Sequence, residues 1–365
     1  MKDKLYYTTT YNGCDALKSE ITESIDALYT SNLIYTDSVD IADIVIFFCC
    51  SFTSERENNS GIIIKELQKK GKKIIVTGCF LPRFKVLFPD VDFVQRKDLQ
   101  NYLVYKYKIL GTWQSRKTYC LDIKDTPIIN IASGCVGHCA YCSIRQVRGK
   151  LISRSVNDIL HKIEQIEDKR RIKLVGQDVS AFGCDIGSSL PELLRTIWKK
   201  YPNIHIELGN LNVSFLKSYS LSDLELFKYI DGNINLPVQS ASNDILKKMD
   251  RDYSIEDFYR LYNILSDFNC RISTDIIAGY PTETEKEHKM NMNLFKNYYF
   301  DFAQIFMFDP RPNTRAANMI QVDTNLKERR TIELIAQFLS TFHNKHHYSY
   351  NKMKEIQFYN TNITI

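Results

Sequence analysis

The sequence predicts an α/β protein in which a parallel-sheet domain is followed by a second strand–helix domain of the (β/α) barrel type. Two observations lead to this prediction. Strand-like and helix-like segments alternate along nearly the whole chain, the pattern of parallel sheets covered by helices. Several strands are continuous apolar runs, such as ADIVIFFCC at residues 42–50, which is typical of strands buried on both faces. The 365 residues would form about two or three domains.

The first domain, expected at residues 1–110, alternates strands and helices from its start. Residues 15–31 carry apolar side chains at helical spacing, and residues 54–71 predict a helix that Gly71 would close. Strands are expected at residues 4–13, 32–37, 42–50 and 72–79.

Three cysteines of this domain share a position relative to its strands. Cys14, Cys50 and Cys79 each follow the carboxyl end of an expected strand. Ligands of open α/β sheets bind at that edge, so the three thiols could converge on one metal site. The alternative is that cysteines such as Cys49 and Cys50 are small buried apolar residues. Three cysteines at equivalent strand ends favour a site.

The second domain is expected at residues 127–342, after a polar linker at 111–126 and before a short polar tail at 343–365. Expected helices include residues 155–168 and 242–249. Chemistry in a (β/α) barrel sits at the carboxyl ends of its strands. Polar residues fall at those ends here: Gln177, Asp178, Gln239, Ser240, Asp275 and Arg311. Strands are expected at residues 128–135, 171–178, 203–210, 234–240, 270–281 and 302–310.

Three further cysteines lie close together at the start of this domain. Cys135, Cys139 and Cys142 form a C-x-x-x-C-x-x-C pattern. Thiolates favour zinc or iron–sulfur clusters. Structural zinc takes four ligands, and His138 is badly spaced to be the fourth. A [4Fe–4S] cluster usually takes four cysteines, so three would leave one iron open to a small molecule.

Charge and hydropathy limit the possible partners only weakly. The formal net charge is +5, and the basic clusters at residues 65–73 and 167–173 are typical of solvated helix faces. We see no apolar run of the roughly 18 residues that a membrane span needs, and no secretory signal. The expected location is therefore the cytoplasm, where cysteines are thiols or metal ligands rather than disulfides.

The run GCVGHCAYCSIRQVRGKLISR, residues 134–154, resembles the radical S-adenosylmethionine (SAM) superfamily and, within it, the methylthiotransferase family. Tyr141 is the aromatic residue that precedes the last cysteine of this signature. The resemblance covers nearly the whole chain, because further family-like segments follow in order. They are VGQDVSAFG at 175–183, LPVQSASNDILKKMDRDY at 236–253, STDIIAGYPTET at 273–284 and FDPRPNTRAA at 308–317.

This resemblance implies a partial TIM barrel, a transferase activity and two cofactors. Cys135, Cys139 and Cys142 would hold a [4Fe–4S] cluster whose open iron binds SAM and releases a 5′-deoxyadenosyl radical on reduction. The contexts of Cys14, Cys50 and Cys79 match those of a second [4Fe–4S] cluster, which carries the sulfur. One SAM methylates this sulfur and a second SAM supplies the radical, so that C–H becomes C–SCH3. A reducing partner such as flavodoxin or ferredoxin is implied.

Five residues are expected to contact SAM on the same resemblance. Tyr141 should lie by the adenine, and Gln177, Gln239 and Asp275 near the methionine or ribose. Glu207 could hold ribose hydroxyls or be an ordinary carboxylate at a strand end. The remaining cysteines are interpreted as structural, although Cys49 could replace Cys50 as a ligand. They are Cys49, Cys120, Cys184 and Cys270.

Three departures from the family pattern affect the expected substrate and the second cluster. The loop after Cys14 is short and lacks the usual Asn, and Phe48–Cys49 replace the usual Asn–Thr. No C-terminal TRAM domain, the family's small tRNA- or protein-gripping barrel, is expected. We therefore expect a peptide or protein substrate, such as a ribosomally made peptide, with adenosine in tRNA as the alternative. Two other hypotheses are a radical enzyme whose second cluster only relays electrons, and a non-catalytic iron–sulfur or zinc redox sensor.

Overall fold

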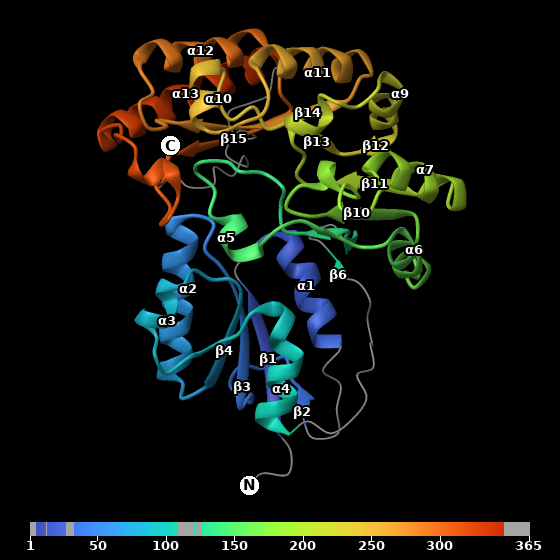
Figure 1. The fold of residues 1–365 in the computed structure, drawn as a ribbon, viewed down its shortest axis with the longest axis vertical. Helices are drawn as coiled ribbons and strands as arrows, with labels where there is room; N and C mark the ends of the chain where they lie inside the picture. Colours follow the sequence, from blue (N-terminus) through green and yellow to red (C-terminus); the bar gives the residue numbers. More distant parts are fainter. Residues whose placement is uncertain (1–4, 12, 27–32, 109–119, 122–125, 347–365) are drawn as a thin grey trace.

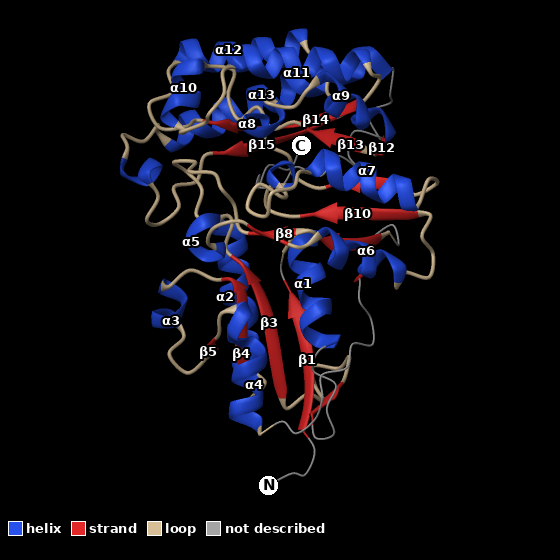
Figure 2. Cartoon of the chain, turned by 45° about the vertical axis from the view of Figure 1, so that its right-hand side comes forward, coloured by secondary structure: helices blue, strands red, loops and turns tan. Residues whose placement is uncertain are grey.

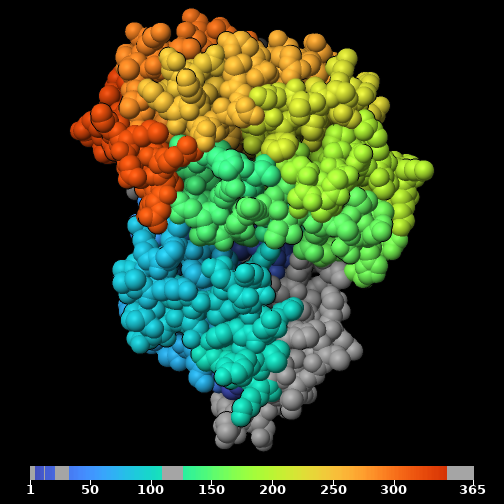
Figure 3. All heavy atoms as spheres, viewed as in Figure 1, coloured from blue at the N-terminus to red at the C-terminus, as the bar shows by residue number. Residues whose placement is uncertain are grey.

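A computed structural model describes residues 5–11, 13–26, 33–108, 120–121 and 126–346 of the chain. It consists of two α/β bodies. The first is blue to cyan in Figure 1, and the second is green to orange and lies above it. On the face drawn in Figure 3, the green atoms of the second body rest on the cyan and blue atoms of the first.

The first body is a five-stranded parallel sheet in the order β2-β1-β3-β4-β5. The strands predicted at residues 4–13, 32–37, 42–50 and 72–79 are all present. Helices flank both faces of this sheet. The strands are β1 (Leu5–Tyr11), β2 (Leu33–Tyr35), β3 (Ile44–Cys50), β4 (Lys73–Cys79) and β5 (Asp92–Phe93), and the helices are α1 (Asp15–Asp26), α2 (Ser54–Lys69), α3 (Arg83–Leu87), the 3-10 helix η1 (Arg96–Asp98) and α4 (Leu99–Tyr107).

β3 is buried on both faces, as its continuous apolar sequence predicts. Ile46 and Phe48 pack into a core with residues of α1 and α4. Phe47 and Cys49 point the opposite way, into a core with residues of α2 and α3. The alternation follows from the two-residue period of a strand, and it separates Cys49 from Cys50.

The strand order reverses direction between β1 and β3, which makes this position the topological switch point of the sheet. The connection from β1 leads to β2 on one side, and the connection from β3 leads to β4 on the other. Ligands of such sheets bind outside the carboxyl ends of the strands at this point. Figure 2 shows the arrows of β1 and β3 pointing towards the second body. The ligand-binding edge of the first sheet therefore faces the second body.

The observed ends of α1 and α2 can be compared with the helix ranges predicted from the sequence. Thr53 caps α2, accepting a hydrogen bond at Oγ1 from the Arg56 amide at 3.2 Å. Gly71 has a φ of 66° and follows α2, as predicted. α1 is described to Asp26, and the rest of its predicted range lies outside the described residues.

The second body is an open, curved arrangement of mostly parallel strands with helices outside it, a partial barrel. One sheet has the order β12-β11-β10-β7-β6 and the other β13-β14-β15. Gly232, with a φ of 76°, lies between β12 and β13 and joins the two sheets. The strands are β6 (Cys120–Leu121), β7 (Pro127–Asn130), β10 (Arg171–Val175), β11 (His205–Leu208), β12 (Ile230–Asp231), β13 (Asn233–Asn235), β14 (Arg271–Ala278) and β15 (Phe302–Met307).

Amphipathic helices cover the outside of these strands and form one large core with them. A small hairpin of β8 (Ala132–Ser133) and β9 (Ile152–Ser153) brackets the three-cysteine loop. The helices are α5 (Ile144–Arg148), α6 (Val156–Glu164), η2 (Val179–Ala181), α7 (Leu190–Lys200), α8 (Val213–Leu216), α9 (Leu221–Leu224), η3 (Glu225–Tyr229), α10 (Asn243–Lys248), α11 (Ile255–Asp267), α12 (Glu285–Asn297), η4 (Arg315–Asn318) and α13 (Thr324–His346).

Two segments differ from the sequence-based expectation. β6 lies within the expected linker and pairs antiparallel with β7, while the linker residues 111–119 and 122–125 lie outside the described residues. α13 runs to His346, so the start of the expected tail is helical. The domain boundaries themselves remain a prediction. Among the described helices, none is long and apolar enough to cross a membrane.

Candidate functional site

The three-cysteine loop follows β8 and ends in α5. Gly134 opens it with a φ of 79°, and a Cβ there would lie 2.0 Å from the carbonyl oxygen of Lys150, so only glycine fits. The Gly134 amide donates to Gln177 Oε1 at 2.7 Å. Gln177, at the end of β10, therefore holds the first residue of the loop in place.

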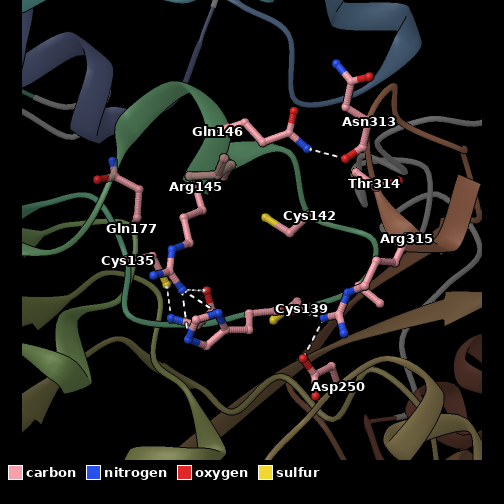
Figure 4. A pocket seen from close by; sticks show the side chains of 14 residues that line it. Cys135, Cys139, Cys142, Arg145, Gln146, Gln177, Asp250, Asn313, Thr314 and Arg315 are labelled. Carbon is pink, nitrogen blue, oxygen red and sulfur yellow. Dashed lines mark hydrogen bonds and ion pairs between the residues drawn. The ribbon is translucent and has the colours of Figure 1, made fainter.

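Backbone hydrogen bonds fix the positions of the three thiols. The Cys135 amide donates to the carbonyl of Gly149 at 3.3 Å, and the Cys142 amide to that of Cys139 at 3.2 Å. The amide of Ala140 donates to the Met249 carbonyl at 2.9 Å, which ties the loop to the end of α10. All three cysteines line one hollow of about 430 Å³ (Figure 4).

Two groups donate directly to the sulfur atoms. The Gly137 amide donates to Cys135 Sγ at 3.2 Å, and Arg251 Nη1 to Cys139 Sγ at 3.1 Å. A Cβ at Gly137 would lie 3.3 Å from Cys135 Sγ, so glycine leaves room beside that sulfur. Hydrogen bonds to cysteine sulfur are a means by which proteins tune iron–sulfur clusters.

The zinc alternative does not fit this loop. Arg145 Nη1 lies 2.6 Å from Nδ1 and 2.9 Å from Nε2 of His138. A guanidinium only donates, so the His138 ring nitrogen that accepts from Arg145 has its lone pair engaged and is not free to bind a metal. Among the described residues, no group of three or more His, Cys, Asp or Glu side chains is arranged to hold a metal ion. Each thiolate of a [4Fe–4S] cluster binds a different iron, so its sulfurs stand farther apart than those around one ion.

Burial keeps these thiols protonated until a metal takes the place of the proton. It raises the pKa of Cys135 to about 11 and that of Cys142 to about 12. It likewise raises the pKa of Cys79 in the first body to about 12. Metal binding by cysteine requires the thiolate, so a bound cluster has to displace these protons.

Arg251, which the sequence analysis missed, joins the loop to a buried polar network. Its Nη2 donates to Asn212 Oδ1 at 2.8 Å, and Asn212 Nδ2 donates to Asp178 Oδ2 at 3.1 Å. Burial raises the pKa of Asp178, whose Oδ1 accepts from the hydroxyl of Ser180. Arg251 belongs to a segment quoted for the resemblance, but no spacing or periodicity distinguishes it there.

A second cavity, of about 250 Å³, extends from the same loop into the barrel. It is lined by the three cysteines and by four of the five residues expected to contact SAM. Burial raises the pKa of one of them, Asp275, to about 6, and its Oδ2 accepts from Asn235 Nδ2 at 3.3 Å. Those four residues are Tyr141, Gln177, Gln239 and Asp275.

Glu207, the fifth expected residue, does not line this cavity. It lies on β11 between Ile206 and Leu208, which face the core. The alternation of a strand turns Glu207 to the other face, where its Oε1 lies 3.9 Å from Arg171 Nη1. Both interpretations of Glu207, a ribose contact and an ordinary strand carboxylate, remain predictions.

The three expected cysteines of the first body lie at the carboxyl edge of its sheet. Cys14 follows β1, while Cys50 and Cys79 end β3 and β4 and are register partners. β1 and β3 flank the switch point, so this is the edge where the fold places a ligand. Cys49 is fully buried in the core on the other face of β3, which disfavours it as a replacement for Cys50.

The other leftover cysteines lie apart from both groups. Cys184 is exposed, and Cys270, at the start of β14, is partly buried against the core. The side chain of Cys120 lies outside the described part of the chain. The structural interpretation of these three cysteines remains a prediction.

The two groups of cysteines lie near a common interface between the bodies. Phe52 and Thr53, just after Cys50, line the same 250 Å³ cavity as the three-cysteine loop. Arg311 reaches across, donating from Nη2 to the Ser51 carbonyl at 3.0 Å and pairing with Glu57 of α2. The chain thus brings both groups of thiols to one side of the barrel.

Comparisons with known proteins agree with this architecture. The family model "Radical SAM superfamily" matches residues 129–295, and the model "Uncharacterized protein family UPF0004" matches residues 5–90. The solved structure of the radical SAM methyltransferase TsrM from Kitasatospora setae has a TM-score of 0.59 at 11% identity, covering 84% of this chain and 77% of that one. At that identity the likeness concerns the fold alone.

Two curated relatives match both bodies. The threonylcarbamoyladenosine tRNA methylthiotransferase of Xenopus laevis is 30% identical over 332 residues, covering 84% of this chain and 60% of that protein. The probable threonylcarbamoyladenosine tRNA methylthiotransferase of Methanocaldococcus jannaschii is 28% identical over 370 residues, covering 94% of this chain and 85% of that protein. The chain therefore spans less than two thirds of the first relative and most of the second.

The partial barrel and its three-cysteine loop lie in a domain, residues 129–295, that matches the radical SAM superfamily. With the UPF0004 domain on its N-terminal side, the chain is similar over both bodies to the radical SAM methylthiotransferase family. This family uses two [4Fe–4S] clusters and SAM. The assignment of one cluster to each group of three thiols remains a prediction.

Proposed function

We propose that this chain methylthiolates an adenosine of tRNA, converting a C–H bond into C–SCH3 with two SAM molecules per turnover. Both relatives described above are named for this class of substrate. The peptide or protein substrate expected from the sequence finds no support in those names. We therefore place tRNA first and keep a peptide as an outcome of the test.

The cavity that both bodies line is the single observation that carries this proposal. Cys135, Cys139 and Cys142 lie on its barrel side, and Phe52 and Thr53, next to Cys50, lie on the other. A radical reaction of this kind requires the two cofactor sites to reach one substrate carbon, because proximity makes capture effectively unimolecular. When bound, the clusters and SAM supply the radical and the methylthio sulfur.

The side chains around the cavity suit a flat base. Phe52 is 44% exposed, and its ring lies 6.4 Å from that of Phe306 in an edge-to-face pair. Both line the cavity, and aromatic side chains are common stacking partners for an unpaired base. Phe52 would thus hold the adenine between the two cofactor sites, while Asp275 and Gln239 face the bound SAM.

The proposal is tested with reconstituted protein under anaerobic conditions. The protein receives reductant and methyl-labelled SAM together with either a tRNA fraction or a peptide and protein fraction. Mass spectrometry then identifies which fraction gains a methylthio group. Label in tRNA is the expected result. Label in the peptide fraction alone would overturn the tRNA proposal and support the peptide or protein substrate expected from the sequence.

A further variant separates base recognition from radical formation. Phe52→Ala should lower methylthio product strongly and leave 5′-deoxyadenosine formation in place, because Phe52 belongs to the first body and is not one of the thiols of the three-cysteine loop. Phe52→Tyr, which keeps the ring, should retain most of the product. Equal product from Phe52→Ala and the parent protein would remove Phe52 from the proposed site.

A further inference from the structure

Arg148 is a buried cation that contacts a cysteine of the other body. It is the last residue of α5, the helix that begins two residues after Cys142. Its side chain is only 5% exposed, and its Nε donates to Cys79 Sγ at 3.0 Å. The helix that follows the three-cysteine loop therefore ends with a side chain that donates to a thiol of the first body.

Glu20 of α1 balances the charge of Arg148. The Glu20 carboxylate is fully buried and pairs through Oε1 with Arg148 Nη1 and with Arg96 Nη1. Asn130 Nδ2 also lies 3.3 Å from this oxygen. Arg148 Nη2, however, is buried and has no hydrogen-bond partner among the described residues. The guanidinium thus retains one unused donor next to Cys79.

We propose that Arg148 is a positioning residue for the cluster held by Cys14, Cys50 and Cys79, and that it raises the reduction potential of that cluster. This inference rests on the function proposed above. Net charge and hydrogen bonds to sulfur set such potentials. Reduction adds one electron from an external reductant, no bond forms or breaks, and the nearby cation stabilises the added negative charge. Arg148 Nη2, which has no partner among the described residues, would donate a hydrogen bond to a second sulfur of the same site.

The same contact relates the two cofactor sites to each other. α5 continues directly from the loop that carries Cys142, and Cys79 ends β4. A rigid, planar guanidinium links these elements at the interface, and a flexible ammonium would do so less firmly. Arg148 therefore contributes both charge and geometry, which two substitutions can separate.

The test uses the full chain with Cys135, Cys139 and Cys142 replaced by Ala, so that the remaining iron reports the first body alone. The midpoint potential is measured by redox titration followed by electron paramagnetic resonance. Arg148→Gln should lower the reduced-to-oxidised ratio at a fixed potential about tenfold, which corresponds to 59 mV for one electron. Arg148→Lys keeps the charge and should recover most of this shift.

Two substitutions in the same ion cluster serve as controls. Arg96→Gln removes a cation that pairs with Glu20, but Arg96 makes no contact with Cys79 that the structure records, and its side chain is 33% exposed. This variant should move the potential much less than Arg148→Gln does. Glu20→Gln removes the opposing negative charge and should move the potential upward.

The outcomes distinguish this inference from the proposed function. If the triple-cysteine background binds no iron, both fail, because the first body then holds no cluster. If iron binds and Arg148→Gln leaves the potential unchanged, only the inference fails. If Arg148→Gln loses its iron, Glu20→Gln decides: an upward shift supports the inference, and an unchanged potential overturns it.

Discussion

Ser54 and Asp309 lie 255 positions apart and are joined by two hydrogen bonds. The Ser54 amide donates to Asp309 Oδ2 at 2.6 Å, and the Ser54 hydroxyl donates to Oδ1 at 2.8 Å. Ser54 is the first residue of α2, where a negative charge is favoured by the helix dipole. A carboxylate of the barrel thus caps a helix of the first body, four residues after Cys50.

Asp309→Asn should separate methylthio transfer from SAM cleavage. The amide keeps the shape of the side chain but loses the charge-assisted bonds, which are each worth about 1.5–3 kcal/mol when intact. We expect methylthio product to fall about tenfold, one factor of ten being 1.4 kcal/mol, while 5′-deoxyadenosine formation is retained. The measurement is the ratio of the two products. Asp168→Asn, on an exposed surface pair with Arg170, is the control and should leave the ratio unchanged.

Cys139→Ala should abolish 5′-deoxyadenosine formation. The loop would lose one of its three thiols together with the Arg251 contact to that sulfur. Product is measured by chromatography under strong reductant with SAM. Cys184→Ala, an exposed cysteine that lines neither hollow, should retain the parent activity. Normal 5′-deoxyadenosine from Cys139→Ala would exclude this loop as the radical site.

Cys79→Ala should retain SAM cleavage and form no methylthio product. Cys79 lies in the first body, so its loss leaves the barrel loop intact. The matched control is Cys49→Ala on the opposite face of β3, which should keep product formation at a stability cost of about 1 kcal/mol. Continued methylthio transfer by Cys79→Ala would show that the cluster of the first body is not the sulfur carrier.

Strand periodicity and strand ends made much of this site predictable. The apolar run of β3 identified a doubly buried strand, and the position of Gln177 just after β10 placed it at the barrel mouth, where it accepts from the Gly134 amide. Contacts between distant segments leave no local pattern in the sequence, so the roles of Arg251 and of the Ser54–Asp309 pair were not predicted. Glu207 shows a further limit: the sequence located its strand end, but whether its side chain lines the cavity depends on contacts with distant residues such as Arg171.

Asp275→Asn should stabilise the protein without its cofactors at neutral pH relative to the parent protein. Burial raises the pKa of Asp275 to about 6, above the roughly 3.9 of an unfolded aspartate. Between these values the folded state binds more protons than the unfolded state, so the stability contribution of Asp275 falls as the pH rises. The free-energy cost of burying the ionised Asp275 carboxylate is absent below about pH 4 and complete above about pH 6.

The amide cannot ionise, so the variant escapes this cost. Its gain over the parent in urea midpoint should therefore be larger at pH 7 than at pH 4.5. Asp168→Asn provides the opposite case, because Arg170 lowers the pKa of Asp168 to about 2 and no gain at neutral pH is expected. An equal difference between Asp275→Asn and the parent at both pH values would show that Asp275 is not desolvated at the cavity wall.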